Sequence, residues 1–252
     1  MRKNLSTKQI EKYSRQIVLK NVGIIGQKKI LDSSVLVVGA GGLGCPVIDY
    51  LSRAGVGLIG IIDYDKVDAS NIHRQSIYTY KDIGKYKVEV LKRKLKDINP
   101  DVKTKIFKSK ITNKNVDKIL KQFDIIIDGS DNFKTKFLLN KFARKLKKTL
   151  IVGAISKYDG HVFSFNFKRN NEACLKCFYQ SDVNEEVLNC ETDGILGPVA
   201  GMVGNMQANE VLKNILNLKN QLRDKILIID LLNLTFRQAN FSKKKNCVCG
   251  ER

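Results

Sequence analysis

The chain has 252 residues, of which 43% are hydrophobic and 28% are charged, and its formal net charge at pH 7 is +20. This length and composition are those of a globular protein that needs no disulfide bonds to fold. No apolar run reaches the ~18 residues of a transmembrane helix, and the charged N-terminus lacks the apolar segment of a secretory signal, so we expect a cytoplasmic protein with no membrane partner.

The positive charge raises the question of nucleic-acid binding. Lysines occur in nearly every predicted helix, however, and the sequence contains no recognised nucleic-acid-binding motif and no aromatic stacking platform. We therefore interpret the charge as a solvated, lysine-rich surface. A functional basic face stays open as an alternative, and it would attract an acidic protein partner or ATP rather than read a base sequence.

The first half of the chain alternates between helices and short β-branched runs. Such runs, bounded by glycine or polar residues, predict buried parallel strands. One or two helices are expected over 8–31, followed by strand 34–39, helix 44–54, strand 58–63, helix 85–98 and strand 102–107.

The alternation continues to about residue 154 and then changes. We expect strand 124–128, helix 134–146 and strand 150–153, then an antiparallel strand 161–167, a long loop 170–193, a helix 197–217 and strands 225–231 and 234–241. This order predicts an α/β fold: a doubly wound, Rossmann-like, mostly parallel sheet that continues into a C-terminal antiparallel extension. We expect one domain, 1–252, made of N-terminal helices (1–31), a nucleotide-binding half (32–154) and a second half (155–252).

A glycine-rich loop joins the first of these strands to its helix. Gly39, Gly41, Gly42 and Gly44 match the pattern G-x-G-x-x-G, in which glycines allow the backbone to approach phosphates at a helix N-terminus. Asp63 ends the next strand, where a carboxylate can bind ribose hydroxyls. The sequence therefore predicts a nucleotide site, although this pattern alone indicates NAD at least as strongly as ATP.

Further motifs follow in a fixed order along the chain. They occupy residues 13–17 (YSRQI), 38–45 (VGAGGLGC), 62–65 (IDYD), 70–75 (SNIHRQ), 84–89 (GKYKVE), 128–132 (DGSDN) and 189–198 (NCETDGILGP). In this combination the chain resembles the ThiF/MoeB family of sulfur-carrier adenylyltransferases, which are related to ubiquitin-activating enzymes. The resemblance extends over residues 13–250.

The resemblance implies an ATP-dependent adenylyltransferase. Such an enzyme joins the C-terminal glycine carboxylate of a small β-grasp sulfur-carrier protein, ending in Gly-Gly, to AMP and releases pyrophosphate. A separate sulfur donor, a sulfurtransferase or a cysteine desulfurase, then serves thiamine or molybdopterin (molybdenum cofactor) biosynthesis. Residues 155–252 would be the carrier-binding half, and which of the two carriers is used stays open.

Candidate catalytic residues follow from the charges that the reaction brings together. A carboxylate and ATP are both anionic, so the site must neutralise the charge that moves onto pyrophosphate. Arg74, after the second strand, and Lys87, at the start of the next helix, are placed to do this. The resemblance implies that Asn71 helps to hold the phosphates and that Asp131 holds or orients Mg²⁺. Asp65 is another candidate ligand for the Mg²⁺ site. Asp131 could also cap the helix that follows it.

The resemblance also assigns a role to the N-terminal helices. It implies that Arg15 reaches the ATP site of a neighbouring subunit, which makes the expected enzyme a homodimer.

The cysteines suggest a metal site and a possible nucleophile. Cys174 and Cys177 form a C-x-x-C pair, and Cys247 and Cys249 could complete a tetrahedral structural Zn²⁺ site. The second pair has one intervening residue where the family usually has two, so unligated or redox-active thiols remain an alternative. Cys190 lies where the family carries a cysteine proposed to act covalently, and whether it does so here stays open.

Two other enzyme classes were weighed. A nicotinamide-dependent oxidoreductase would explain the glycine loop and Asp63 but would leave Arg15, Arg74 and Lys87 without a role. A tRNA-modifying, dehydratase-type adenylyltransferase would share the family motifs, and the cysteine-rich second half disfavours it.

Overall fold

The computed structural model describes residues 4–169, 172–179, 194–245 and 247. Three short helices precede the sheet, where one or two were predicted: α1 (Thr7–Lys12), α2 (Ser14–Ile17) and α3 (Gly23–Asp32). Ser6 caps α1, with its hydroxyl accepting from the Gln9 N–H and the Gln9 side chain accepting from the Ser6 N–H. Tyr13, between α1 and α2, is almost completely buried and ties these helices to the domain.

The predicted alternation of strands and helices is present over 34–156. Its elements are β1 (Ser34–Val38), α4 (Gly44–Ala54), β2 (Leu58–Ile62), η1 (Ala69–Asn71), η2 (Tyr80–Asp82), α5 (Lys87–Ile98), β3 (Lys103–Phe107), α6 (Val116–Leu120), β4 (Ile125–Asp128), α7 (Phe133–Lys145) and β5 (Thr149–Ser156). The two 3₁₀ turns, η1 and η2, were not predicted, because single turns of three residues have no detectable periodicity.

The antiparallel extension is also present. It consists of β6 (Asp159–Asn166), α8 (Leu175–Phe178), α10 (Gly197–Leu216), β7 (Lys225–Asp230) and β8 (Thr235–Asn240). The prediction of an unbroken loop over 170–193 is wrong in its described part, because α8 lies within it. Leu175 and Cys177 of this single turn are buried, so tertiary packing stabilises a helix too short to be read from the sequence.

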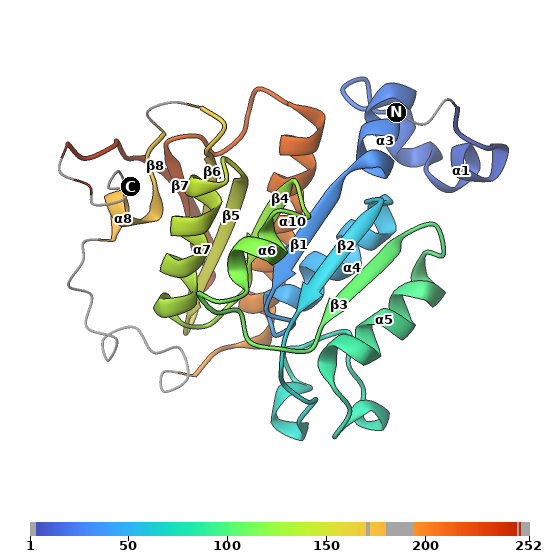
Figure 1. Ribbon diagram of the computed structural model, residues 1–252, viewed down its shortest axis with the longest axis horizontal. Helices are drawn as coiled ribbons and strands as arrows, with labels where there is room; N and C mark the ends of the chain where they lie inside the picture. The colour runs from blue at the N-terminus through green and yellow to red at the C-terminus, as the bar shows by residue number, and fades with distance from the viewer. Residues whose placement is uncertain (1–3, 170–171, 180–193, 246, 248–252) are drawn as a thin grey trace.

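All strands of the described residues belong to one eight-stranded sheet with the order β3-β2-β1-β4-β5-β6-β7-β8. Pairs from β3 to β5 are parallel, and pairs from β5 to β8 are antiparallel. The predicted fold class is therefore confirmed. Helices cover both faces of the parallel part (Figure 1): α3, α4, α5 and α10 pack on one face, and α6, α7 and α8 pack on the other.

The two hydrophobic cores explain why the strands are apolar without alternation. Val35 and Val37 point into the core under α4 and α10, whereas Leu36 and Val38 point into the core under α6 and α7. A strand that is buried on both faces reads as a continuous apolar run. Among the described helices, none is long and apolar enough to span a bilayer.

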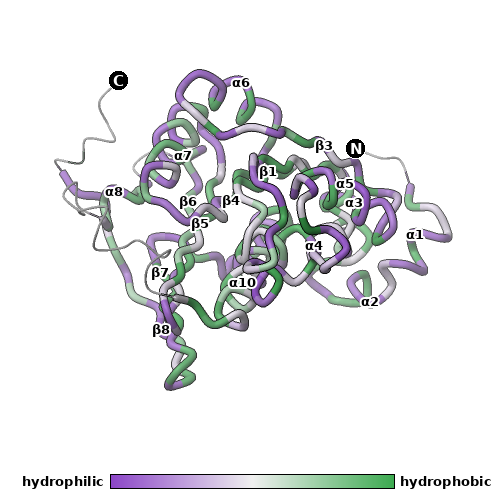
Figure 2. Tube along the Cα trace, turned by 90° about the horizontal axis from the view of Figure 1, so that it is seen from below, coloured by the Kyte–Doolittle hydropathy of each residue, from purple (hydrophilic) through white to green (hydrophobic). Residues whose placement is uncertain are grey.

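The strand order places a topological switch point between β1 and β4. These strands are neighbours, and the chain leaves them toward opposite faces of the sheet. Ligands of open α/β sheets bind at such a point, beyond the carboxyl ends of the strands. Figure 2 shows α1 and α2 at one end of the molecule and α8 and β8 at the other, with the switch point between them.

Candidate active site

The glycine loop follows β1 at the switch point. Gly39 has φ +91°, and a Cβ at this position would lie 2.7 Å from the Gly129 oxygen; a Cβ on Gly44 would lie 2.0 Å from the Gly39 oxygen. The fold itself therefore requires these two glycines. A Cβ on Gly41 would meet only the Gln75 side chain, at 3.6 Å. Protein packing therefore does not require glycine at position 41, and the missing side chain there leaves space for a ligand.

Asp63 fastens this loop to the end of β2. Its Oδ2 accepts from the Ala40 N–H at 2.7 Å, and its Oδ1 accepts from the Asp65 N–H at 2.8 Å. Asp63 is 9% exposed, and this burial raises the pKa of its carboxyl, while the Lys87 charge and the two N–H donors oppose the rise. Each carboxylate oxygen can accept a further hydrogen bond, so the observed contacts leave the expected ribose contact possible.

Lys87 and Arg74 stand on the β2 side of the same site. Lys87 begins α5, its side chain is buried, and its Nζ lies 3.2 Å from Asp65 Oδ2, which is about half exposed. Arg74 follows η1 and donates from its guanidinium to the Ser70 oxygen at 2.9 Å. Asn71, the last residue of η1, lines the same cleft. The loop after β2 and the start of α5 therefore bring together the cations that the sequence predicts.

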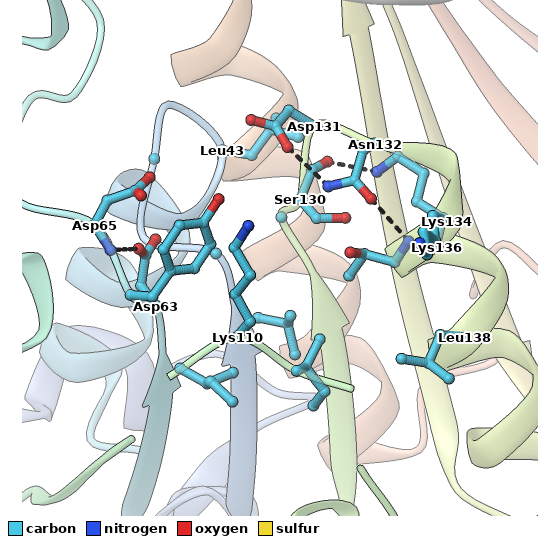
Figure 3. Close-up of a pocket in the computed structure, with 18 of the residues that line it drawn as sticks. Leu43, Asp63, Asp65, Lys110, Ser130, Asp131, Asn132, Lys134, Lys136 and Leu138 are labelled. Carbon is cyan, nitrogen blue, oxygen red and sulfur yellow. Dashed lines mark hydrogen bonds between the residues drawn. The ribbon is translucent and has the colours of Figure 1, made fainter. Parts of the chain in front are cut away.

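Asp131 and Asn132 stand on the β4 side, opposite Asp63 and Asp65 (Figure 3). Asn132 is the residue that caps α7, accepting from the Thr135 N–H at 2.9 Å. The alternative in which Asp131 caps this helix is therefore wrong, because Asn132 occupies the N-cap position. Asp131 is exposed, and Asn132 Nδ2 donates to its Oδ1 at 3.1 Å.

A buried ion pair lies beneath the turn 128–131, and it was not identified from the sequence. Asp128 is fully buried, Lys136 is 3% exposed, and their charged groups lie 3.4 Å apart. Burial raises the pKa of Asp128, and the Lys136 charge and the Ser130 donors oppose that rise. The helical period could have revealed Lys136, because it shares the buried face of α7 with Leu139, Asn140 and Ala143.

These groups surround one cleft of about 2060 Å³. Small-molecule sites usually measure about 300–1,000 Å³, so the cleft has room for more than one nucleotide-sized ligand. The predicted site residues that line it are Gly39, Gly41, Gly42, Asp63, Asp65, Asn71, Arg74, Lys87 and Asp131. Ala154 and Ile155 of β5, together with Gly194 and Ile195, line it as well, which extends the cleft toward the antiparallel part of the sheet.

Two predicted catalytic residues are not brought to this cleft. Arg15 is exposed on α2, which packs against α3, and it is not among the residues that line the cleft. Cys190 lies outside the described residues, and its role stays a prediction.

Three of the four predicted metal ligands meet at the other end of the sheet. The Sγ atoms of Cys174 and Cys247 are 3.8 Å apart, those of Cys174 and Cys177 are 3.9 Å apart, and all three lie within 4.8 Å of one another. Tetrahedral Zn²⁺ with bonds of about 2.3 Å separates its sulfur ligands by about 3.8 Å. The cluster is therefore able to hold a metal ion. Cys249 lies outside the described residues.

The sixth cysteine of the chain, Cys45, belongs to the core. It is fully buried in α4, and burial raises the pKa of its thiol to about 12. A thiol with such a pKa stays protonated near neutral pH and is a poor nucleophile.

Comparison with known proteins identifies relatives over nearly the whole chain. The sequence profile of the ThiF family matches residues 13–250. A protein of Dictyostelium discoideum named adenylyltransferase and sulfurtransferase MOCS3 is 36% identical over 98% of this chain, which spans 59% of that relative. A sulfur carrier protein adenylyltransferase of Thermus thermophilus is 37% identical over 96% of this chain and 92% of its own length. Among solved structures, Escherichia coli MccB with MccA-N7isoASN superposes with a TM-score of 0.85 at 23% identity, covering 98% of this chain and 76% of that one.

Proposed function

This chain belongs to the ThiF family, and on that premise we propose that it uses MgATP to adenylate the C-terminal carboxylate of a small sulfur-carrier protein. The observation that carries the proposal is the cleft at the switch point, which is lined by Arg74, Lys87 and Asp131 together with the glycine loop. Adenylation needs cations where negative charge develops on pyrophosphate. Arg74, Lys87 and Asn71 supply that environment, and Asp63 binds the ribose.

Asp131 fits the Mg²⁺ that accompanies ATP. Mg²⁺ in nucleotide sites is held by one or two carboxylates together with substrate phosphates. Asp131 is exposed to the cleft and, among the described residues, only Asn132 hydrogen-bonds its carboxylate. It would hold the ion, which neutralises phosphate charge when bound, and Asp65 would take part while paired with Lys87.

The length of the cleft supports a protein substrate. A nucleotide on the glycine loop would leave the part beside Ala154 and Gly194 for an extended chain end. We assign this part to the Gly-Gly tail of a β-grasp carrier, with 32–154 as the nucleotide half and 155–252 as the carrier half of one cytoplasmic domain. A separate sulfurtransferase or cysteine desulfurase would supply the sulfur, for thiamine or molybdopterin biosynthesis.

The proposal is tested by ATP–pyrophosphate exchange with purified protein. The assay is run without a carrier, with a thiamine-type carrier and with a molybdopterin-type carrier. Exchange that requires one carrier establishes the reaction and identifies the pathway. A folded, ATP-binding protein that catalyses no exchange with either carrier would contradict the proposal, and binding of NADH in place of ATP would support the oxidoreductase alternative.

The cysteine cluster supports structural zinc. Cys174 precedes α8 and Cys177 lies within it, whereas Cys247 comes from the C-terminal segment, so one ion would tie that segment to α8. Asn140 of α7 accepts from the Leu175 N–H at 3.0 Å, which fastens the same turn to α7. Cys249 would be the fourth ligand.

We expect one Zn²⁺ per chain by elemental analysis of protein purified without added metal. Cys174→Ser should abolish the metal content and lower the melting temperature, because a structural site contributes directly to folding. Cys45→Ser is the matched control: it removes a buried thiol outside the cluster and should keep the zinc. Wild-type protein that contains no metal and is insensitive to chelators would contradict the zinc site.

Exposed apolar side chains around Arg15 support the homodimer. Val18, Leu19 and Ile25 are 75%, 56% and 69% exposed. Apolar side chains exposed on a folded protein can mark an interaction surface. A second copy that covers them would bring its Arg15 against this chain, and we assign that Arg15 to this chain's cleft, which this chain's own Arg15 does not line.

A further inference from the structure

A buried lysine lies beneath the turn that carries Asp131. Lys136 Nζ donates to the backbone oxygens of Ser130 and Gly153, each at 2.7 Å, and lies 3.4 Å from Asp128 Oδ2. An ammonium group has three N–H donors, and these contacts use all three. Lys136 therefore lines the cleft without a free donor for a phosphate, so it is not a direct ligand of the nucleotide.

Asp128 holds the same turn from its other side. Its Oδ1 accepts from the Ser130 N–H at 2.9 Å and from the Ser130 hydroxyl at 2.6 Å. Its backbone oxygen accepts from the side chain of Gln207, on α10, at 2.9 Å. Ser130 is thus fixed through its N–H, its hydroxyl and its carbonyl, and the next residue in the chain is Asp131.

The burial of this pair needs an explanation other than stability. Removing an ammonium and a carboxylate from water carries a desolvation cost that a pair of apolar side chains would avoid. The pair connects the end of β4, the turn after it and Gly153 of β5. Because no described contact except that from Asn132 holds the Asp131 carboxylate, its place in the cleft depends on this turn.

We propose that Lys136 is a positioning residue for adenylyl transfer, which ties the turn 128–131 to β5 and thereby places the Asp131 carboxylate. This role rests on the proposed function, in which Asp131 acts on the phosphates of ATP.

Lys136→Met in the full chain tests the proposal by steady-state ATP–pyrophosphate exchange. We expect kcat to fall about 10- to 100-fold, because a displacement of ~1 Å at a reacting group can cost that much. KM for ATP should change much less than kcat, because the Asp131 carboxylate keeps its charge and can still hold Mg²⁺ after a small displacement, whereas the alignment needed in the transition state is lost. Lys136→Arg, which keeps the charge and several donors, should recover most of the lost kcat.

Lys94→Met is the control for removing a lysine that pairs with a buried carboxylate, which here keeps Arg93 as a second partner at 2.7 Å. Lys94 lies 2.7 Å from Asp82, whose side chain is 2% exposed, and neither residue lines the cleft. Lys94→Met should lower the melting temperature and keep kcat within about twofold of the wild type.

Three kinetic results would overturn the positioning role. The first is a wild-type kcat in Lys136→Met, and the second is an increase in KM for ATP at an unchanged kcat. If Lys136→Met does not fold, the double variant Asp128→Asn, Lys136→Met is used instead, because it leaves no unpaired buried charge. The third result is a wild-type kcat in that double variant.

Amide hydrogen exchange of the peptide covering 128–132 separates this proposal from the proposed function. The Ser130 N–H is held by Asp128, so Lys136→Met should exchange faster there than wild type, with no carrier or ATP required. Unchanged exchange would overturn the positioning role. A wild-type protein that lacks activity with every carrier would instead overturn the proposed function.

Discussion

Replacing Lys87 with methionine is expected to lower the rate of ATP–pyrophosphate exchange by about 10²–10³-fold, the usual cost of removing one charge-stabilising donor from a preorganised site. Lys87 begins α5, and its buried ammonium lies beside the glycine loop and Asp65. A cation in a partly dehydrated position stabilises the negative charge that develops on the leaving pyrophosphate more strongly than a solvated cation, because there is little water to screen the attraction.

This substitution should leave the fold intact. The ion-pair partner of Lys87 is Asp65, whose side chain is 46% exposed, so water can solvate that carboxylate. Asp63 also loses a favourable charge, but it keeps its hydrogen bonds from the Ala40 and Asp65 N–H groups. A buried carboxylate without a partner would cost far more. Circular dichroism and a thermal melt should therefore match the wild type, which separates a catalytic loss from unfolding.

Lys108→Met is the matched control for the Lys87 experiment. Lys108 also pairs with an acid of the same region, Glu89, at 3.0 Å, but both side chains are about half exposed and neither lines the cleft. Its exchange rate should stay within about twofold of wild type, as is usual for exposed ion pairs. Equal rates for Lys87→Met and the wild type would remove Lys87 from the mechanism.

Local sequence signals were sufficient to predict most of the fold. The runs at β1, β2 and β4 are apolar and β-branched because both sheet faces are buried there, and the loop at 39–44 can be identified because glycine is required at φ +91° and in close backbone contacts. The motifs that carry Arg74, Lys87 and Asp131 each follow a strand or open a helix. Parallel strands bring such positions to one edge of the sheet, so their convergence was predictable.

Features that depend on contacts between distant segments were not predictable. The helical period places Lys136 on the buried face of α7, but its role depends on Gly153, which lies on the next strand of the sheet. Asp63 was predicted to bind ribose, but its hydrogen bond to the Ala40 N–H also fastens the glycine loop. A single turn such as α8 forms because α7 and the sheet bury it, and four residues have no period that a sequence can display.

The N-terminal helices should complete the active site of a second copy, and mixing two inactive variants tests this. Arg15→Ala and Asp131→Ala are each expected to abolish exchange when pure. In a symmetric dimer that exchanges Arg15 between subunits, a mixed dimer has one site with both residues intact and one site with neither. Equal amounts, refolded or co-expressed together, should therefore recover about a quarter of wild-type activity, because about half of the dimers are mixed and each has one working site.

The structure explains why recovery is the expected outcome. Arg15 is exposed on α2, which packs against α3, and it does not line the cleft of its own chain. An arginine that acted within its own chain would leave both sites of a mixed dimer defective, and the mixture would stay inactive. Sedimentation of the wild type provides the control, since a monomer at assay concentration would contradict the shared site. Aspartate at Val18, which is 75% exposed, should weaken the dimer and abolish exchange together, because separating the subunits removes Arg15 from both sites.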